Sequence, residues 1–449
     1  MTIDTTVLLS DVQEILQSGL KNVFFKWRCE IIVGDNRFTP MKVISAPLKR
    51  DYQVNVADQL ELTVMIKEYE YDYITQADDD RLEVILYKEP QQSNSTATNM
   101  YLVPSTQRFK AVVNYKGVDR PKPKTGQKLS TPDIENSGEQ MKELVLSAFD
   151  LVAETIRLNE VGLTGRNKNP LLFVRAIVGK ESKKVSGGEI AVRGVDIIEP
   201  SNTEVRQHIP IPDGVPLQDL PGYVQKLCGI YNAGIGFYLQ SGLWYIYPLY
   251  DVTRYNKTER NLTVFNVNTN RFPSAESSFK VYGKALKIVN TGKFSFFDNR
   301  EYDYLNVGNG SRFTTCADIS ENFGTYNNGK YTIKRKENNT EAVLENKRTG
   351  MNYAPVSSQR FTSNPFVELS ALAQRECSYA AFEWQNATDE IIYPGMPCKI
   401  YFLSQNDEVK ETTGTVLGVE YFYELAGNRL TDPRYICNAV VKLALRRIL

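Results

Sequence analysis

The chain has 449 residues, with 53 Lys and Arg against 53 Asp and Glu, so its formal net charge at pH 7 is zero. This balance argues against proteins whose main work is to neutralise phosphates, because such proteins need a basic surplus. Hydrophobic residues make up 42% and charged residues 24%, which is ordinary for a soluble globular protein and excludes wholesale disorder. The length predicts about two to four domains. No apolar run approaches the roughly 18 residues that cross a bilayer, and the acidic N-terminal segment is not expected to be a secretory signal.

Residues 21–115 are predicted to form a series of short strands, as in an antiparallel barrel or sandwich. In the first strand, every second residue from Val23 to Val33 is apolar, and Gly34-Asp35-Asn36 supplies a turn. Further strands are expected at 43–45, 52–56, 60–73, 82–87 and 109–115.

The predicted strand over 60–73 changes its apolar side at Lys67, which a bulge or an exit from the barrel would produce. Beyond that point tyrosines and acids alternate, with Tyr69, Tyr71 and Tyr73 on one side and Glu68, Glu70 and Asp72 on the other. Because tyrosines give contact area at low entropic cost, the three tyrosines are a candidate partner surface. The alternative is a long hairpin whose tyrosines only cover the domain.

The middle of the chain contains two segments in which the spacing of apolar residues does not clearly indicate a helix or a strand. Residues 116–140 are rich in Pro, Lys and Gly and are predicted to be a solvated, basic linker. A nucleic-acid contact is the less favoured reading, because no aromatic residues alternate with the charges. Residues 141–158 fit either a helix or a strand.

The counts of histidine and cysteine restrict the chemistry further. The single histidine, His208, rules out every site that needs two histidines. It is interpreted as a structural residue, with a titrating assembly switch as the alternative. No two cysteines form a CxxC pair, which predicts reduced, buried thiols and no zinc site at Cys29, Cys228, Cys316, Cys377, Cys398 and Cys437.

A second organised unit begins near His208. Asp219 is predicted to cap a short helix that ends at Gly229 and has its apolar face at Leu220, Val224, Leu227 and Cys228. A hairpin is expected over 235–247, turning at Gln240-Ser241-Gly242. No phosphate-binding motif fits the glycines of this region, so turn roles are expected for Gly229, Gly234 and Gly236.

The C-terminal third is predicted to contain one helix and three strands. Residues 298–350 are polar and expected to be loop-rich, and Asn364-Pro365 opens a helix. In the last strand, alternate residues from Cys437 to Leu445 are apolar, so the C-terminal segment is expected to lie in a sheet. The three strands are predicted at 398–403, 415–423 and 436–445.

Residues 212–255 (PDGVPLQDLPGYVQKLCGIYNAGIGFYLQSGLWYIYPLYDVTRY) resemble a helix-plus-hairpin segment of baseplate hub proteins of contractile-tailed bacteriophages, especially large-genome ones. The C-terminal pieces YPGMPCKIYFL and GTVLGVEY are similar to a hub strand pair. The resemblance to the same group of proteins extends to residues 154–162, 190–200, 270–283 and 306–310. The resemblance touches most of 150–449 and carries no catalytic signature.

This resemblance implies a mainly β (α+β) fold, with two tube-like antiparallel β-barrel domains, inserted mixed domains and a few short helices. It implies a homotrimer whose six barrels form a pseudo-sixfold ring around a central channel. Such a hub adapts the hexameric tail tube to the central spike. The implied partners are the spike, the tail tube protein, other baseplate proteins and the tape measure protein. The implied location is the baseplate of the virion tail, after assembly in the host cytoplasm, and the genome passes the channel without specific binding.

The resemblance and the strand pattern together divide the chain into five segments. They are a first tube-like barrel with an N-terminal helix (1–120), a basic linker and inserted strand-rich domain (121–200), the first part of the second tube-like domain (201–285), a loop-rich insertion with a helix (286–379) and the strands that complete the second barrel (380–449). By the same resemblance, residues 141–158 are expected to be strands.

No catalytic, cofactor-binding or metal-binding residues are expected. One alternative is a glycan hydrolase, which needs only two carboxylates, from Glu68, Glu70 and Asp72 or from Asp298 and Asp303. Another is a peripheral baseplate or receptor-binding protein. Asp78-Asp79-Asp80 could suggest calcium, but it lacks the glycine and ligand spacing of a calcium loop, so a solvated turn is predicted.

Overall fold

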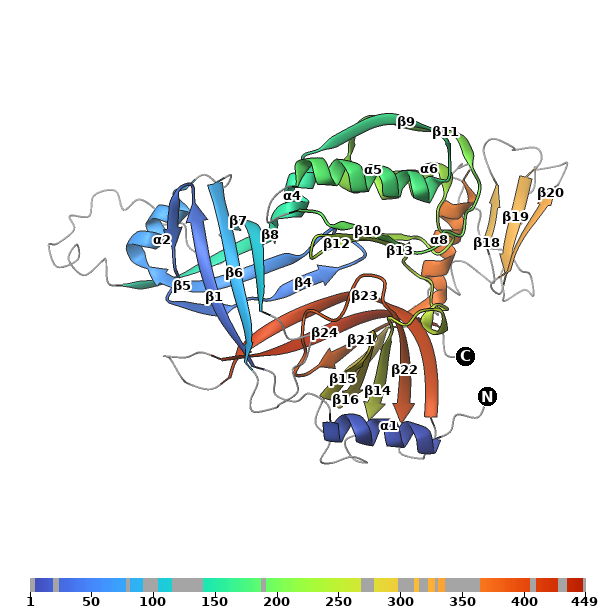
Figure 1. Cartoon of the computed structure of the whole chain (residues 1–449). Helices are drawn as coiled ribbons and strands as arrows, with labels where there is room; N and C mark the ends of the chain where they lie inside the picture. The colour runs from blue at the N-terminus through green and yellow to red at the C-terminus, as the bar shows by residue number, and fades with distance from the viewer. Residues whose placement is uncertain are drawn as a thin grey trace.

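The computed structural model is mainly β, with one large sheet, an inserted helical unit above it and a small separate sheet at one side (Figure 1). None of the helices within the described segments is both long enough and apolar enough to span a membrane. The structure describes residues 5–18, 24–77, 81–91, 104–114, 140–186, 191–267, 278–297, 311–314, 322–327, 330–335, 364–403, 409–426 and 434–446.

Eight strands of the large sheet pair in a closed circuit, which we call the first ring. Each strand is antiparallel to both neighbours, and the order is β23-β4-β5-β8-β7-β6-β1-β24 and back to β23. Closure leaves no free sheet edge in this ring. Its strands are β1 (Phe24–Val33), β4 (Leu48–Asp51), β5 (Gln59–Lys67), β6 (Leu82–Gln91), β7 (Ser105–Val113), β8 (Met141–Asp150), β23 (Val409–Leu425) and β24 (Tyr435–Arg446), with β2 (Asn36–Phe38) and β3 (Lys42–Ser45) attached to β1 and β5.

The interior of the first ring is filled by side chains. Alternate residues of its strands point inward and are buried, as the period of a strand requires. Phe25, Leu62, Val84 and Leu146 are each no more than 1% exposed and belong to one core. An eight-stranded ring is just wide enough for side chains to fill, so this ring is a packed core and not a pore.

The other lobe of the large sheet, the second sheet, shares β23 and β24 with the first ring. Its order is β15-β16-β14-β22-β23-β24-β21-β17, and no pairing among the described strands joins β15 to β17. Helix α1 (Thr5–Ser18) packs Val12 and Ile15 against Phe265 and Val289 of this lobe. The strands are β14 (Leu262–Val267), β15 (Ser278–Tyr282), β16 (Ala285–Asn290), β17 (Phe294–Phe297), β21 (Cys377–Trp384) and β22 (Pro397–Leu403).

Strand β23 passes from the second sheet into the first ring at a β-bulge. Residues 409–415 pair with β22, whereas residues 418–421 pair with β4, and the bulge lies between Val416 and Gly418. A Cβ atom at Gly418 would lie 2.7 Å from the carbonyl oxygen of Arg50. Glycine therefore permits the close approach of β4 where the strand changes partners.

The inserted unit lies above the large sheet (Figure 1) and has its own core. Two helices are sandwiched between the antiparallel β9–β11 pair and the sheet β10-β13-β12. Its elements are α4 (Leu151–Arg157), β9 (Glu160–Lys168), α5 (Pro170–Val185), β10 (Gly194–Ile197), β11 (Arg206–Pro216), η3 (Leu217–Asp219), α6 (Leu220–Cys228), β12 (Ile235–Gln240) and β13 (Leu243–Pro248). Turn η4 (Tyr255–Lys257), helix α8 (Pro365–Glu376) and the sheet of β18 (Ser311–Thr314), β19 (Asn322–Asn327) and β20 (Lys330–Arg335) complete the description.

Several predicted elements are confirmed. The Gly34 turn joins β1 to β2, and Gly34 has a φ of 59°. The hairpin after residue 235 is β12–β13, and Gly229 ends α6 with a φ of 76°. Asn364 caps α8 by accepting a hydrogen bond from the Phe366 amide. The three C-terminal strands are β22, β23 and β24, and the inward residues from Cys437 to Leu445 are buried.

Four local predictions are wrong, each for a local reason. The strand over 60–73 ends at Lys67, and helix α2 (Glu68–Thr75) follows, because Glu70 accepts a hydrogen bond from the Lys67 amide at 3.2 Å and starts a helix. Residues 52–56 form a turn after β4 and no strand. Leu227 is 39% exposed, outside the buried face of α6. The Asp219 side chain makes no capping hydrogen bond, because η3 already leads into α6.

The segment boundaries also differ from the expected ones. Helix α1 packs on the second sheet and not on the first ring. The helix and hairpin of 201–250 pack with α5 and β9 in the inserted unit, so the second sheet begins at β14. Residues 141–158 contain both predicted types, strand β8 and helix α4. Most of the 116–140 linker, Asp78–Asp80, Asp298, Asp303 and Cys316 lie outside the described residues.

Candidate functional site

The three tyrosines predicted as a partner surface lie on α2 and do not share one face. Tyr69 is 55% and Tyr73 is 48% exposed, whereas Tyr71 is 4% exposed and belongs to the core of the first ring. Alternate residues share a face on a strand but not on a helix. A partner role therefore stays a prediction for Tyr69 and Tyr73 only.

The acids beside these tyrosines anchor α2. Glu68 contacts the Lys142 ammonium at 2.5 Å, and Asp72 lies 3.8 Å from it. Glu70 accepts hydrogen bonds from the Lys67 amide and the Tyr69 hydroxyl. These contacts tie the helix to β8 and give all three carboxylates a structural role.

The histidine and cysteines occupy unrelated places. His208 is exposed on β11, directly opposite Arg166 of β9. Within the described part of the chain, no three His, Cys, Asp or Glu residues are grouped to hold a metal ion. Five cysteines are free and buried, and burial raises the pKa of the thiols of Cys29, Cys398 and Cys437 above their usual range.

Four buried charged residues, Arg50, Asp58, Lys88 and Asp389, form what we call the junction cluster. Each is no more than 6% exposed. The Arg50 guanidinium donates to both oxygens of Asp58 at 3.0–3.1 Å and to the carbonyl oxygen of Asp389. Lys88 pairs with Asp389 and, at 3.1 Å, with Glu390. Burial opposes ionisation of Asp389, but the charges of Lys88 and Arg50 hold its pKa below the usual value.

The junction cluster joins the first ring to two other parts of the chain. Arg50 and Lys88 come from β4 and β6, whereas Asp389 lies in the segment between β21 and β22. The Tyr238 hydroxyl of β12 donates to Asp58 at 3.0 Å. Gln240, also on β12, donates to the Ile392 carbonyl oxygen at 3.0 Å. The cluster therefore fixes the inserted unit and the 385–396 segment against one end of the first ring.

The open end of the second sheet presents aromatic side chains. Strand β17 pairs with β21 along one edge, and its other edge has no partner among the described strands. Phe296 is 48% and Phe297 is 59% exposed on this strand. An unpaired edge with exposed aromatic groups is a template for pairing with another chain.

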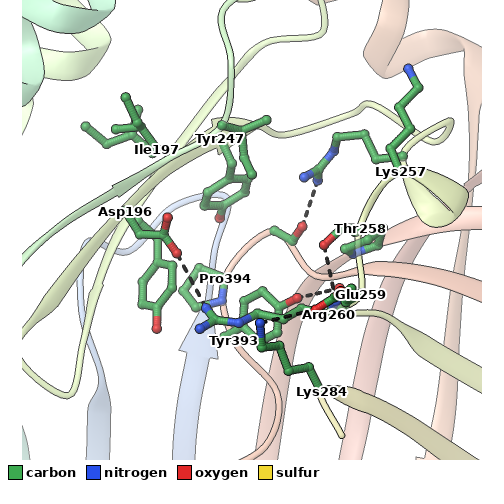
Figure 2. A pocket seen from close by; sticks show the side chains of 16 residues that line it. Asp196, Ile197, Tyr247, Lys257, Thr258, Glu259, Arg260, Lys284, Tyr393 and Pro394 are labelled. Carbon is green, nitrogen blue, oxygen red and sulfur yellow. Dashed lines mark hydrogen bonds and ion pairs between the residues drawn. The ribbon is translucent and has the colours of Figure 1, made fainter.

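A pocket of about 420 Å³, which we call the junction pocket, lies where the inserted unit meets the second sheet. Figure 2 shows Asp196 and Tyr247 on one side of it and Arg260, Lys284 and Tyr393 on the other. Arg260 pairs with Asp196 at 3.5 Å, and Lys284 pairs with Glu259 at 3.2 Å. The lining comes from β10, β13, the 254–260 turn, the turn before β16 and the segment that leads into β22.

Neither the junction cluster nor the junction pocket was predicted from the sequence. Their charged residues are isolated in sequence and lie in segments without a motif. Only the fold brings Arg50 to Asp389 and Asp196 to Arg260.

Comparisons with known proteins give structural neighbours only. No family model and no curated protein sequence matches the chain. The solved structures that are similar to it include phage tail proteins. A tail protein from Neisseria meningitidis shares 9% identity at a TM-score of 0.46, with 93% of this chain and 96% of that chain covered. The 43 kDa tail protein of prophage MuSo2 from Shewanella oneidensis shares 10% sequence identity at a TM-score of 0.45, again with 93% of this chain and 96% of that chain covered. An Escherichia coli component of the type VI secretion system shares 8% sequence identity at a TM-score of 0.37, with 90% of this chain and 73% of that chain covered.

Proposed function

We propose that this chain is a non-enzymatic structural subunit of a phage tail baseplate. In this proposal three copies form a hub with a central channel, which adapts the hexameric tail tube to the central spike. The proposed role falls in the same class as the tail proteins described above. The virion tail is the proposed location, after assembly in the host cytoplasm.

The observation that carries the proposal is the division of one sheet into two curved lobes. The first ring and the second sheet share β23 and β24, so each chain holds two eight-stranded units in a fixed relation. The units differ in detail, because the first is wholly antiparallel whereas β14 of the second pairs in parallel with β16 and β22. Three such chains around a threefold axis would present six β units, which matches the symmetry of a hexameric tube. The sequence resemblance of 212–255 to hub proteins supports the same assembly.

The packed interior of the first ring restricts where a channel can lie. Because side chains such as Leu62 and Val84 fill this ring, nothing can pass through it. A channel must therefore lie between chains, lined by outer faces of the sheet. A formal net charge of zero suits such a channel, because accumulated phosphate contacts would retain passing DNA.

Self-association would use the open end of the second sheet. The edge of β17 that pairs with no described strand and the exposed Phe296 and Phe297 offer backbone hydrogen-bonding groups and apolar area. A head-to-tail contact of this kind closes into a ring when its rotation matches the symmetry.

The test is electron microscopy of the purified full chain, alone and mixed with tube and spike proteins, classified without imposed symmetry. We expect threefold rings with an open centre, joined coaxially to the tube or the spike. Density away from the tail axis would overturn the proposal in favour of a peripheral or receptor-binding protein. Cleavage of peptidoglycan by the purified chain in a zymogram would overturn its non-enzymatic part.

A further inference from the structure

We propose that one face of the β9–β11 pair binds an acidic, extended segment of a partner protein. Four side chains make up this surface, which we call the basic face: Arg166 and Lys168 of β9, and Arg206 and His208 of β11. The inference does not depend on the oligomeric state of the chain. It rests on the register of the two strands, on the charges around them and on the place of the pair in the molecule.

The register of the pair places these four side chains together on its outer face. His208 lies directly opposite Arg166, and the next row pairs Arg206 with Lys168. Directly opposite residues lie on the same face of a sheet. Ile209 of β11 is buried in the core of the inserted unit, so the alternate residues on either strand side of it point outward. All four side chains of the basic face are exposed.

The basic face has a surplus of positive charge. Arg206 contacts Glu204 at 3.3 Å, in a pair that is open to water. Arg166 and Lys168 have no ion-pair partner within the described part of the chain. Helix α5, which begins two residues after Lys168, has no acid in its first turn. Because like charges directly opposite each other destabilise a sheet, carboxylates from a partner would relieve a repulsion and also form charged hydrogen bonds.

The spacing of the basic face matches an extended peptide. Its two cross-strand rows are two residues apart along each strand, which is about 7 Å. Alternate side chains of an extended peptide have the same spacing and point to the same side. Acids at alternate positions of such a peptide would therefore bring one carboxylate to each row.

The β9–β11 pair can also accept a third strand. Neither strand pairs with any other strand that the structure describes. β11 contains Pro210, Pro212 and Pro216, which have no backbone N–H group, whereas β9 contains no proline. The edge of β9 is therefore the better template for an added strand, whose acids would lie next to Arg166 and Lys168. In Figure 1 the pair lies on top of the inserted unit, on the side away from the large sheet, where a partner can reach it.

These features favour a protein segment over a nucleic acid. β9 and β11 contain no Phe, Tyr or Trp on which bases could stack. The basic face is also small beside a DNA-binding site, which makes about six to ten phosphate contacts. The backbone groups of a strand edge, in contrast, are complementary to another peptide.

Fluorescence anisotropy of the full chain tests the inference. The probe is a peptide of alternating Glu and Thr residues with a neutral fluorophore, and the blank has Gln in place of Glu. We expect saturable binding of the Glu peptide alone. This binding should be weaker at an ionic strength of about 0.15 M than at about 0.01 M, because the Debye length falls from about 30 Å to about 8 Å. Saturable binding of a single-stranded oligothymidylate without binding of the Glu peptide would overturn the proposal in favour of a nucleic-acid site.

A charge-reversal variant connects the binding to the basic face. Arg166→Glu combined with Lys168→Glu should weaken binding by about tenfold or more, since each change replaces an attraction with a repulsion. The unfolding midpoint of this variant should not fall, because the new acids lie directly opposite Arg206 and His208.

The matched control makes the same change in net charge elsewhere. Lys183→Glu combined with Lys257→Glu alters exposed positions at the end of α5 and in η4, and it should bind like the wild type. The proposal fails if the wild type gives no saturable change in anisotropy with the Glu peptide at either ionic strength. Equal weakening in the two double variants would also overturn it, since the peptide would then respond only to the net charge of the chain.

Discussion

At the scale of single residues, the junction cluster shows why buried charges must be considered together. Asp58 accepts from the Arg50 guanidinium and from Tyr238, so it neutralises a cation that has no access to water. Removing one partner of a buried pair is costly because the other charge stays buried. The pair is therefore a condition for placing the inserted unit on the first ring.

We expect Asp58→Ala to lower the free energy of unfolding by about 3–5 kcal/mol, because Arg50 would lose its carboxylate partner. Urea denaturation measures this change. Glu61→Ala, at an exposed position on β5, the strand that directly follows Asp58, is the control and should cost less than about 0.5 kcal/mol. A loss below about 1 kcal/mol for Asp58→Ala would show that water reaches the cluster.

Asp150 makes the stability of the fold depend on pH. Burial raises its pKa to about 7, although the Ala153 amide donates to its carboxylate at the start of α4. Its unfolded pKa is near 3.8, so between these values the folded state binds the additional proton. Stability therefore falls as pH rises from about 4 to 7, by at most about 1.4 kcal/mol per pH unit from this group.

We expect Asp150→Asn to remove this contribution while keeping a good helix cap. The variant should become more stable relative to the wild type as pH rises from 4.5 to 7. Urea denaturation at both pH values gives the difference. An equal difference at the two pH values would contradict a raised pKa for Asp150.

At the scale of elements, α1 acts as a cover for the second sheet. Its buried residues Val12 and Ile15 contact Phe265 and Val289, and Lys280 and Lys287 pair with acids of the helix at 2.8 Å. The helix lies under the ends of β14–β16 in Figure 1. The residues that make this apolar contact are far apart in sequence. The sequence therefore predicts the helix but not the sheet against which it packs.

We expect Ile15→Ala to destabilise this contact by about 2–5 kcal/mol, because a fully buried side chain is removed. Hydrogen exchange should increase in β15 and β16 and stay unchanged in β5 and β8 of the first ring. Gln13→Ala, at an exposed position on the same helix, should leave exchange as it is. Faster exchange throughout both lobes would mean that α1 supports the whole sheet.

The elements also show how far the sequence predicts the fold. Strict alternation identified β1 and β24 correctly, because a half-buried strand has a period of two. The same rule failed beyond Lys67, where alternating tyrosines and acids belong to a helix that is fixed by the Glu70 hydrogen bond. Closure of the first ring could not be predicted, because it depends on β1 pairing with β24 at the far end of the sequence. The junction pocket shares this property, since its lining comes from five separate segments.

At the scale of the whole molecule, the closed first ring and the open second sheet have different consequences for assembly. The first ring has no free edge, so its strands cannot pair with another chain. Among the strands that the structure describes, the second sheet ends at β17, where Phe296 and Phe297 are exposed. Under the proposed function, self-association should therefore depend on the second lobe.

If the chain forms the proposed trimer, we expect the double substitution Phe296→Asp and Phe297→Asp to shift it towards monomer, because charges would replace the proposed apolar contact at the sheet edge. Mass photometry at fixed protein concentration measures the distribution. Val205→Asp, at a position 63% exposed on the inserted unit, is the matched control and should leave it unchanged. Trimers that persist in the double variant would place the subunit contacts elsewhere.

The sharing of β23 and β24 also determines when the protein can fold during synthesis. A ribosome releases β1, β4, β5, β6, β7 and β8 first, and these strands can form only an open sheet with β1 and β4 at its edges. Apart from the end of β1 that pairs with β2, both edges stay unpaired until the segment from Val409 to Arg446 emerges. Until that point the nascent chain carries two sheet edges that can pair with other chains, a condition that favours chaperone binding or aggregation. Among the described strands, β23 and β24 are made after all the others, and their pairing completes both lobes in a single event.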